Sequence, residues 1–379
     1  MKFKLSLILC LSGLVLLGQQ SIHNFGNLQL HNAGLLGFHG DLINDGTFDS
    51  NLGLTGFYSD DDSIFISGEF SPSFYDLELA VEGSLQLKTT IHIDNSLNFI
   101  YGNITSSADS KNIYTQFSEN TFYDGALDFS KIDGQAAVDG QKIFSFPVGV
   151  KNTLRPLTIK FVDGPFLAKC AYFNESPDFP QSFSKGFDTS LKDVNMVSVY
   201  SDEFWNVTTS GLIQITLNWD SNSDMISKVE KIDGITVAGW NKKEGQWMNL
   251  GTFEHKGTID RGQVTSDTFN ANDYEIFTFG FLFHRNSSSN NYGMSPNGDG
   301  ANDYFTLKLI DKYPSNKLLI YNRDGRLVFE KSNYKNEFNG ISNKINSQKE
   351  RVLPKGVYFY VLEVKKHKLK FQGYIYLAL

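Results

Sequence analysis

The stretch that decides the fold runs from Leu77 to Phe99 and has the sequence LELAVEGSLQLKTTIHIDNSLNF. Short apolar triplets recur in it, each with a polar residue in the middle, at Leu77 to Leu79, Leu85 to Leu87, Ile91 to Ile93 and Leu97 to Phe99. Alternation over so few positions has the period of a β-strand and not that of a helix. Strands this short and this closely spaced predict a β-solenoid, in which each coil stacks on the next, or a sandwich of short hairpins.

Similar short apolar triplets occur before this stretch, at Leu28 to Leu30 and Ile64 to Ile66. We therefore expect one repetitive, solenoid-like or sandwich region over residues 21–113. Longer alternating runs follow and predict a β-sandwich region over residues 114–283. Its clearest strands are expected at Leu154 to Val162, Met196 to Tyr200, Gly211 to Trp219 and Tyr274 to Phe281. Aspartate–glycine pairs that begin at Asp124, Asp133, Asp139 and Asp233 predict hairpin turns, because glycine tolerates positive φ.

Composition agrees with an ordered chain that is rich in strands and turns. The 379 residues are 40% hydrophobic and 20% charged, and 33 glycines stand against 9 prolines. This length leaves room for two or three domains, each with its own core. A net charge of −8 argues against nucleic acid as a partner, because binding to phosphates needs clustered lysine and arginine.

The first residues have the pattern of a secretion signal. Lys2 and Lys4 precede an apolar run from Leu5 to Leu17 that is too short to span a bilayer, and small or polar residues follow up to Gln20. We therefore expect a signal peptide over residues 1–20 and a secreted protein, with an uncleaved anchor helix as the alternative. Cleavage near Gln20 would leave Cys170 as the remaining cysteine, so an intramolecular disulfide is not expected.

A third region is expected at the C-terminal end of the sequence. The run from Asn286 to Asn291 holds no apolar residue, which is the composition of a flexible linker, and we place that linker at residues 284–291. Residues 292–379 are again predicted to be β, in a small immunoglobulin-like sandwich of five to seven strands. The clearest strands are expected at Tyr304 to Ile310, Lys317 to Tyr321, Leu327 to Lys331, Val357 to Lys365 and Leu369 to Leu377.

Five motifs follow one another in this C-terminal region. They are SPNGDGAND from Ser295 to Asp303, IYNRDG from Ile320 to Gly325, an aromatic turn from Tyr334 to Gly340, LPKGVYFY from Leu353 to Tyr360, and GYIYL from Gly373 to Leu377. In this order they resemble the gliding-motility-associated, type B sorting domain of type IX secretion cargo in Bacteroidetes. The motif positions are Pro296, Asn297, Gly298, Asp299, Gly300, Asn302, Asp303, Asn322, Arg323, Gly325, Pro354, Gly356, Tyr358, Tyr360 and Gly373.

The resemblance implies export across the outer membrane, with the C-terminal domain as the address. It also implies three kinds of partner: the type IX translocon, a shuttle of the PorV kind, and an outer-membrane β-barrel of the PorP/SprF kind. Residues Phe144 to Gly149 and Leu154 to Leu157 resemble a recurring FPVG and RPL pair of the surface proteins that carry this domain. That second resemblance implies no biochemical activity.

Three features of the motifs have more than one reading. Oxygens of Asn297, Asp299 and Asp303 could converge on Ca²⁺, or they could hold a tight turn by bonds to their own backbone; the turn is favoured, because an EF-hand glutamate is missing. Arg323 could contact a receptor or pair with a carboxylate or aromatic ring. The alternating aromatics around Phe359 and Tyr374 would fill a core on one face and, if exposed on the other, offer an apolar stripe to a partner.

The sequence predicts a protein that is not an enzyme. It has no H-E-x-x-H, G-x-S-x-G, P-loop or dinucleotide fingerprint. We expect a structural or adhesin-like protein of the cell surface, associated with the outer membrane and with gliding motility or surface attachment, without a cofactor unless calcium binds. The alternatives are a carbohydrate-active enzyme with the same export domain, or a glycan-binding module. For a glycan-binding module, the candidate stacking rings are Trp205, Trp219, Trp240 and Trp247.

Overall fold

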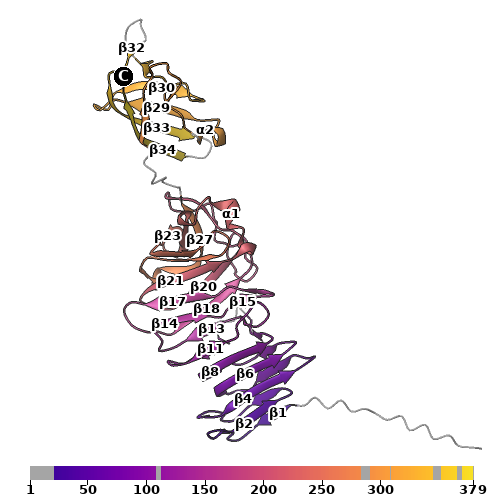
Figure 1. Ribbon diagram of the computed structural model, residues 1–379. Coiled ribbons are helices and arrows are strands. Elements are labelled where there is room, and N and C mark those ends of the chain that lie inside the picture. Colours follow the sequence, from indigo (N-terminus) through magenta and orange to yellow (C-terminus); the bar gives the residue numbers. More distant parts are fainter. Residues whose placement is uncertain are drawn as a thin grey trace, which may run out of the picture. The chain divides into compact units, whose positions relative to one another are not determined.

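The computed structural model describes residues 21–107, 112–282, 291–307, 309–344, 351–364 and 369–378. The chain divides into two compact units after Phe283, which we call the first unit and the second unit (Figure 1). The predicted signal peptide and residues 284–290 of the predicted linker lie outside the described residues. Within the described ranges, no helix is both long enough and apolar enough to cross a membrane.

The first unit begins as a β-solenoid, which is one of the two architectures expected from the sequence. Successive strands of the solenoid alternate between two parallel sheets. One sheet has the order β1 (Ile22–Asn24), β3 (Leu42–Asn44), β5 (Ile64–Ser67), β7 (Leu85–Leu87), β9 (Ile104–Thr105), β12 (Ile132–Asp133). The other begins with β2 (Leu35–Phe38), β4 (Leu54–Ser59), β6 (Ser73–Val81), β8 (Ile91–Tyr101), β10 (Thr115–Phe117), β13 (Ala136–Val138), and β11 (Phe122–Asp124) also pairs with β8.

Like side chains stack on like along the solenoid. Ile22 pairs with Leu42, Leu42 with Ile66 and Ile66 with Leu87, so each coil takes up roughly 20 residues, and the apolar middle of each coil is covered by the next. At one corner the Asn24 amide donates to Asn44 Oδ1 (2.8 Å), and the Asn44 amide donates to the Phe70 carbonyl (2.9 Å). Buried amides in the corners are therefore satisfied by the next coil, which explains why asparagine separates the short strands.

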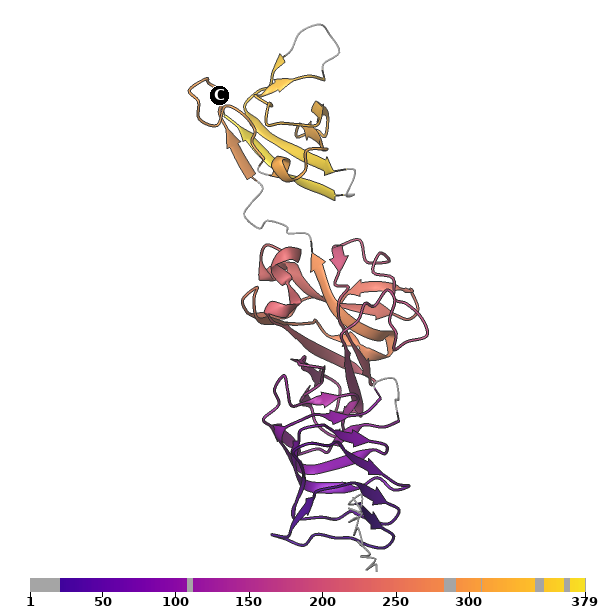
Figure 2. The ribbon, with the colours of Figure 1, turned by 90° about the vertical axis from the view of Figure 1, so that its right-hand side faces the viewer.

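An antiparallel region continues the second solenoid sheet without a break (Figure 2). After β13 that sheet continues through β18 (Ala168–Phe173), β20 (Phe204–Thr208), β27 (Tyr274–Leu282), β22 (Ile235–Asn241) and β23 (Gln246–Asn249), with β19 (Met196–Val199) beside β27, to 13 strands in all. A six-stranded sheet completes the region: β14 (Ile143–Phe146), β17 (Leu157–Phe161), β21 (Leu212–Trp219), β25 (Gly262–Thr265) and β24 (Glu254–Gly257), with β26 (Phe269–Asn270) beside β21. Residues 21–113 and 114–283 thus share one sheet and one hydrophobic core.

The remaining elements of the first unit are short. They are β15 (Gly149–Val150) paired with β16 (Thr153–Leu154), α1 (Met225–Lys228), and 3-10 turns at Ser221–Ser223, Ile232–Gly234 and Ala271–Asp273. The strand predicted from Leu154 to Val162 is broken at Pro156, which has no N–H to donate to a sheet. The prediction of hairpins at the aspartate–glycine pairs is also wrong: Asp133 and Asp139 lie where the chain passes from one sheet to another.

The second unit is a small β-sandwich. Its larger sheet has the order β28 (Asn291–Met294), β34 (Leu369–Leu377), β33 (Gly356–Val364), β29 (Lys317–Tyr321), β30 (Leu327–Ser332), and a smaller sheet pairs β31 (Ile341–Ser342) with β32 (Arg351–Val352). The strand expected from Tyr304 to Ile310 is not formed, and α2 (Leu309–Lys312) begins there instead. Phe305 and Leu307 are buried, but their N–H groups bond to the Phe338 carbonyl and to Asn336 Oδ1 rather than to a neighbouring strand.

Candidate functional site

The first motif of the second unit folds into a loop that is held by its own side chains. Both carboxylate oxygens of Asp303 accept backbone N–H groups, from Gly298 (2.7 Å) and Gly300 (2.8 Å). Asn297 Oδ1 accepts the N–H of Asp299 (3.1 Å). Gly298, Gly300 and Asn302 have φ of 81°, 85° and 54°, a region that glycine and asparagine enter at least cost. The motif therefore specifies the shape of the loop.

The same bonds bear on the calcium hypothesis. Asp299 Oδ1 accepts the Ala301 N–H (2.8 Å), and Oδ2 accepts the Asn297 amide (2.9 Å); these bonds lower the pKa of Asp299. Every carboxylate oxygen that could face a cation is thus already engaged. Among the described residues there is no group of three or more His, Cys, Asp or Glu side chains that could hold a metal ion. The arrangement is that of a side-chain-braced turn, and calcium binding stays a prediction.

The turn between β29 and β30 is built in the same way. Asn322 Oδ1 accepts the N–H groups of Asp324 (3.1 Å) and Arg326 (2.9 Å), and Gly325 has φ of 75°. Arg323 projects from this turn and is exposed, and no residue of the described ranges forms a hydrogen bond or ion pair with its guanidinium. Contact of Arg323 with a receptor stays a prediction.

The aromatic turn and the tyrosines of β33 belong mostly to the core. Tyr334 is fully buried, its hydroxyl donates to the Phe305 carbonyl, and it accepts the Phe338 N–H (3.2 Å). Tyr358 and Tyr360 are also buried. The Tyr358 hydroxyl donates to the Pro354 carbonyl (2.7 Å), which fixes the entry to the strand. Gly373 pairs with Tyr360 across β33 and β34. These motif residues hold the unit together.

The opposite side of the same strands is exposed. Phe359, Tyr374 and Tyr376 are 48%, 39% and 43% exposed, and we call these three side chains the aromatic face. Phe359 pairs directly with Tyr374 on one side and with half-buried Tyr321 on the other. Burial of large aromatic rings is favourable, so an exposed row of them on a sheet marks a surface suited to a partner. The expected apolar stripe is therefore present.

Sheet topology brings three of the motifs to one end of the sheet, which we call the motif end: the loop Ser295–Asp303, the turn Asn322–Gly325 and the segment Leu353–Gly356. Met294, the last residue of β28, pairs with Leu377, and Leu377 pairs with Gly356. Tyr321, the last residue of β29, pairs with Phe359 near the start of β33. The loop, the turn and the segment therefore leave or enter the sheet at the same end, beside the aromatic face.

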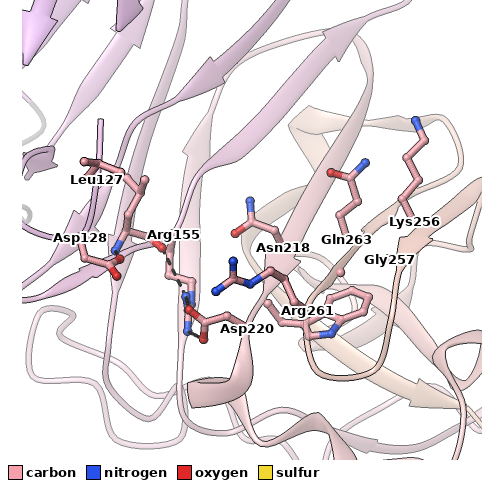
Figure 3. Close-up of a pocket in the computed structure, with 12 residues that line it drawn as sticks. Leu127, Asp128, Arg155, Asn218, Asp220, Lys256, Gly257, Arg261 and Gln263 are labelled. Atoms are coloured by element: carbon pink, nitrogen blue, oxygen red, sulfur yellow. Dashed lines mark hydrogen bonds and ion pairs between the residues drawn. The ribbon is translucent and has the colours of Figure 1, made fainter. Parts of the chain in front are cut away.

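The first unit holds a second candidate site, a pocket of about 670 Å³ (Figure 3). Its floor is Arg155, which is 3% exposed. The guanidinium donates to both oxygens of Asp220 (2.9 and 2.8 Å), to Glu203 (3.0 Å) and to Ser223 Oγ (3.1 Å). Tyr172 donates its hydroxyl to Glu203 as well. We call these side chains the Arg155 network; its residues come from both sheets and join them.

Burial and pairing compete in the Arg155 network. Burial raises the pKa of Glu203, and the positive charge of Arg155 opposes this rise. Burial also acts against the charge of Arg155, but Asp220 and Glu203 raise its pKa above the ordinary value. Two carboxylates and the Ser223 hydroxyl thus accept from a single guanidinium, and Tyr172 bonds to one of these carboxylates. Nothing in the sequence around Arg155 identifies these partners, because Glu203 and Asp220 lie far along the chain.

The four tryptophans do not form the stacking platform that a glycan-binding module would need. Trp205, Trp219, Trp240 and Trp247 are 0%, 2%, 8% and 0% exposed. Two of the indole N–H groups bond to backbone carbonyls inside the protein: Trp205 donates to the Arg155 carbonyl (2.9 Å) and Trp247 to the Phe187 carbonyl (3.0 Å). The proposal of tryptophan stacking rings is therefore wrong, because these rings fill the core.

Comparisons with known proteins agree with the motifs. Residues 288–377 match the family model of the CHU_C type IX secretion signal domain. No curated protein and no solved structure matches the chain significantly. The matched range covers the whole described second unit except its last residue, and it includes the motif end and the aromatic face. The second unit is therefore a type IX secretion signal domain, and the chain is a cargo protein of the type IX secretion system.

Proposed function

We propose that the chain is a structural, adhesin-like protein of the outer cell surface that acts in gliding motility or surface attachment and not as an enzyme. Its export by type IX secretion, to the cell surface or beyond, follows from the signal domain. The adhesin-like role is supported by the construction of the first unit. A solenoid whose sheet and core continue into a sandwich is a stiff support, and a surface protein that bears mechanical load needs one.

The observation that carries the export part of the proposal is the clustering of the motifs. Three segments far apart in sequence meet at the motif end. The fold itself is stabilised elsewhere, by the buried Tyr334, Tyr358 and Tyr360. We propose that the motif end and the aromatic face are read by the secretion machinery. The partners in this proposal are the translocon, a PorV-type shuttle and a PorP/SprF-type barrel that retains the protein at the outer membrane.

An enzyme with the same export domain is the alternative, and the pocket is where its chemistry would be sought. Two carboxylates line the pocket, Asp128 and Asp220. Asp220 is held on both oxygens by Arg155, and Asp128 Oδ1 accepts the Leu154 N–H (2.8 Å). A general acid or base needs a carboxylate that is free to exchange a proton with substrate. The full engagement of Asp220, together with the bond to one oxygen of Asp128, supports the non-enzymatic proposal.

Deletion of residues 292–379 tests the role of the second unit. We expect the truncated protein to accumulate in the periplasm in folded form, and a reporter fused to residues 284–379 to reach the cell surface. A control keeps the whole chain and changes an exposed residue of the first unit, Phe122→Ser, so that the signal domain is unaltered. Normal surface display of the truncated protein would contradict the proposal, whereas loss of adhesion or gliding in a strain that lacks the whole protein would support the surface role.

A further inference from the structure

The pocket of the first unit has two walls that are fixed before any ligand arrives. On one side, β24 and β25 form a hairpin over Trp219, whose indole N–H donates to the carbonyls of Thr258 (3.2 Å) and Ile259 (2.9 Å). A Cβ at Gly262 would lie 2.5 Å from the Trp219 ring, so glycine is required for this close contact. The hairpin is thus held in place by its own backbone and one buried ring.

The other wall is the segment that contains Leu127 and Asp128. The buried Lys131 ammonium donates to the Asp128 carbonyl (2.6 Å) and to the carbonyl of Lys151. Asp128 is fixed further by the N–H of Leu154. Leu127 is 51% exposed and adds an apolar patch to the rim. A pocket of this volume between two fixed walls is in the range of small-molecule sites.

Some polar groups of the pocket already form hydrogen bonds within the protein, and others remain available to a ligand. The floor is closed, because the donors of Arg155 all face protein acceptors. Arg261 points toward Asp220 from the hairpin (Figure 3), but no described residue bonds to its guanidinium. The Gln263 side chain likewise has no hydrogen bond within the described ranges. Asn218 uses its N–H₂ on the Pro156 carbonyl (2.8 Å) and keeps its amide oxygen as an acceptor.

The unused groups are mostly donors, apart from Asp128 Oδ2 and the Asn218 amide oxygen. They include the Arg261 guanidinium, which forms no hydrogen bond or ion pair with a described residue but interacts with the charge of Asp220. Arg261 offers a planar fork of N–H groups that matches the two oxygens of a carboxylate. Lys256 lines the same rim and shares its charge with Glu254 (2.9 Å). Gln263 can both donate and accept, and Asn218 can accept, which is what hydroxyl groups beside a carboxylate require. This combination fits a sugar acid better than a neutral sugar or a cation.

We propose that this pocket binds a uronic acid residue of an acidic saccharide. Arg261 holds the carboxylate, Lys256 adds positive charge at the rim, and Gln263 and Asn218 bond to the neighbouring hydroxyls. Leu127 covers an apolar edge of the ring. This site goes beyond the proposed structural role, because it gives the first unit a ligand of its own. It also differs from the tryptophan platform expected of a glycan-binding module, since recognition rests on charge and hydrogen bonds.

The test is a calorimetric titration of the full mature chain with trigalacturonate, galacturonic acid, galactose and acetate at low ionic strength. We expect saturable binding of trigalacturonate, at least tenfold weaker binding of galactose and acetate, and weaker binding of every acid as salt is added. Equal affinity for galacturonic acid would identify the free sugar acid as sufficient, and a strong preference for trigalacturonate would point to a polymer. No saturable binding of either acid, or equal binding of galactose or acetate, would overturn the proposal.

Matched variants separate the pocket from the general charge of the surface. Arg261→Gln should weaken the binding of the acid at least tenfold and change the free energy of unfolding little, because the side chain is exposed and forms no hydrogen bond or ion pair with a described residue. Arg326→Gln, the same change at an exposed turn of the second unit, should leave the affinity unchanged. An equal effect of both variants, or none of Arg261→Gln, would overturn the assignment. These binding measurements do not depend on export. The role of the signal domain is tested separately, by the deletion of residues 292–379.

Discussion

The two units satisfy their polar groups in opposite ways. In the first unit, the Arg155 network is buried and connects residues from different strands and both sheets. In the second unit, the loop from Asn297 to Asp303 is exposed and bonds almost entirely to itself. A buried network is costly to break because a lost partner leaves a charge without solvent. An exposed loop can be altered at small cost, so its side chains are available for recognition.

The largest expected effect is at Arg155. Arg155→Met removes the guanidinium and leaves Glu203 buried without its cation. We expect the free energy of unfolding of the first unit to fall by about 3–5 kcal/mol. Denaturant titration of residues 21–379, followed by tryptophan fluorescence, measures this loss, because all four tryptophans lie in the first unit. The exposed Arg261→Gln serves as the control. A loss below about 1 kcal/mol for Arg155→Met would show that the network does not join the sheets.

The next effect is at Asp303. Asp303→Ala removes the acceptor of two backbone N–H groups, and we expect the second unit to lose about 1 kcal/mol of stability, since water can replace the carboxylate at an exposed site. Hydrogen exchange of Gly298 and Gly300 should accelerate. The control is Asp324→Ala, whose carboxylate accepts only one long bond from Asn322 (3.3 Å). Equal destabilisation by the two variants would contradict the role assigned to the loop bonds.

An acid titration tests the surface ion pairs of the second unit. Glu330 bonds to Lys317 and Lys344, and these bonds lower its pKa from 4.5 to about 2. Since the folded pKa lies below the unfolded one, the stabilisation is present above about pH 4.5 and is lost as pH falls toward about 2. We expect the thermal midpoint of the second unit to fall in that window. In Glu330→Gln the fall should be smaller, and an identical pH dependence would exclude this source.

The smallest effect on stability, and the sharpest on function, is expected at the aromatic face. Replacing Phe359, Tyr374 and Tyr376 by serine one at a time should change stability by no more than about 0.5 kcal/mol each, because the rings are already exposed. Surface display should nevertheless fall, as measured by protease accessibility on whole cells. Phe122→Ser, at a 58% exposed ring of the first unit, is the control. Undiminished export of all three single variants would exclude this face from recognition.

Sequence reasoning located strands well where alternation was regular. The strands from Lys317 to Tyr321 and from Leu369 to Leu377 have the predicted bounds. The apolar triplets from Ile64 onward lie in strands of the solenoid, whereas the triplet Leu28 to Leu30 forms no strand. It failed from Tyr304 to Ile310, where buried apolar residues alternate but their N–H groups bond to a turn. The periodicity of apolar residues predicts which side chains are buried. It does not predict which groups the backbone N–H and C=O groups bond to.

The amino-acid sequence alone determined that the chain is all-β, that it ends in a separate module, and that this module carries the motifs of a type IX signal domain. These properties depend on neighbouring residues, whose alternation and turn chemistry are local. Only the tertiary structure decided that solenoid and sandwich share one sheet, that the tryptophans are buried, and that Arg155 meets Glu203 and Asp220. Contacts between residues far apart along the chain depend on which strands pair, and no local pattern specifies that.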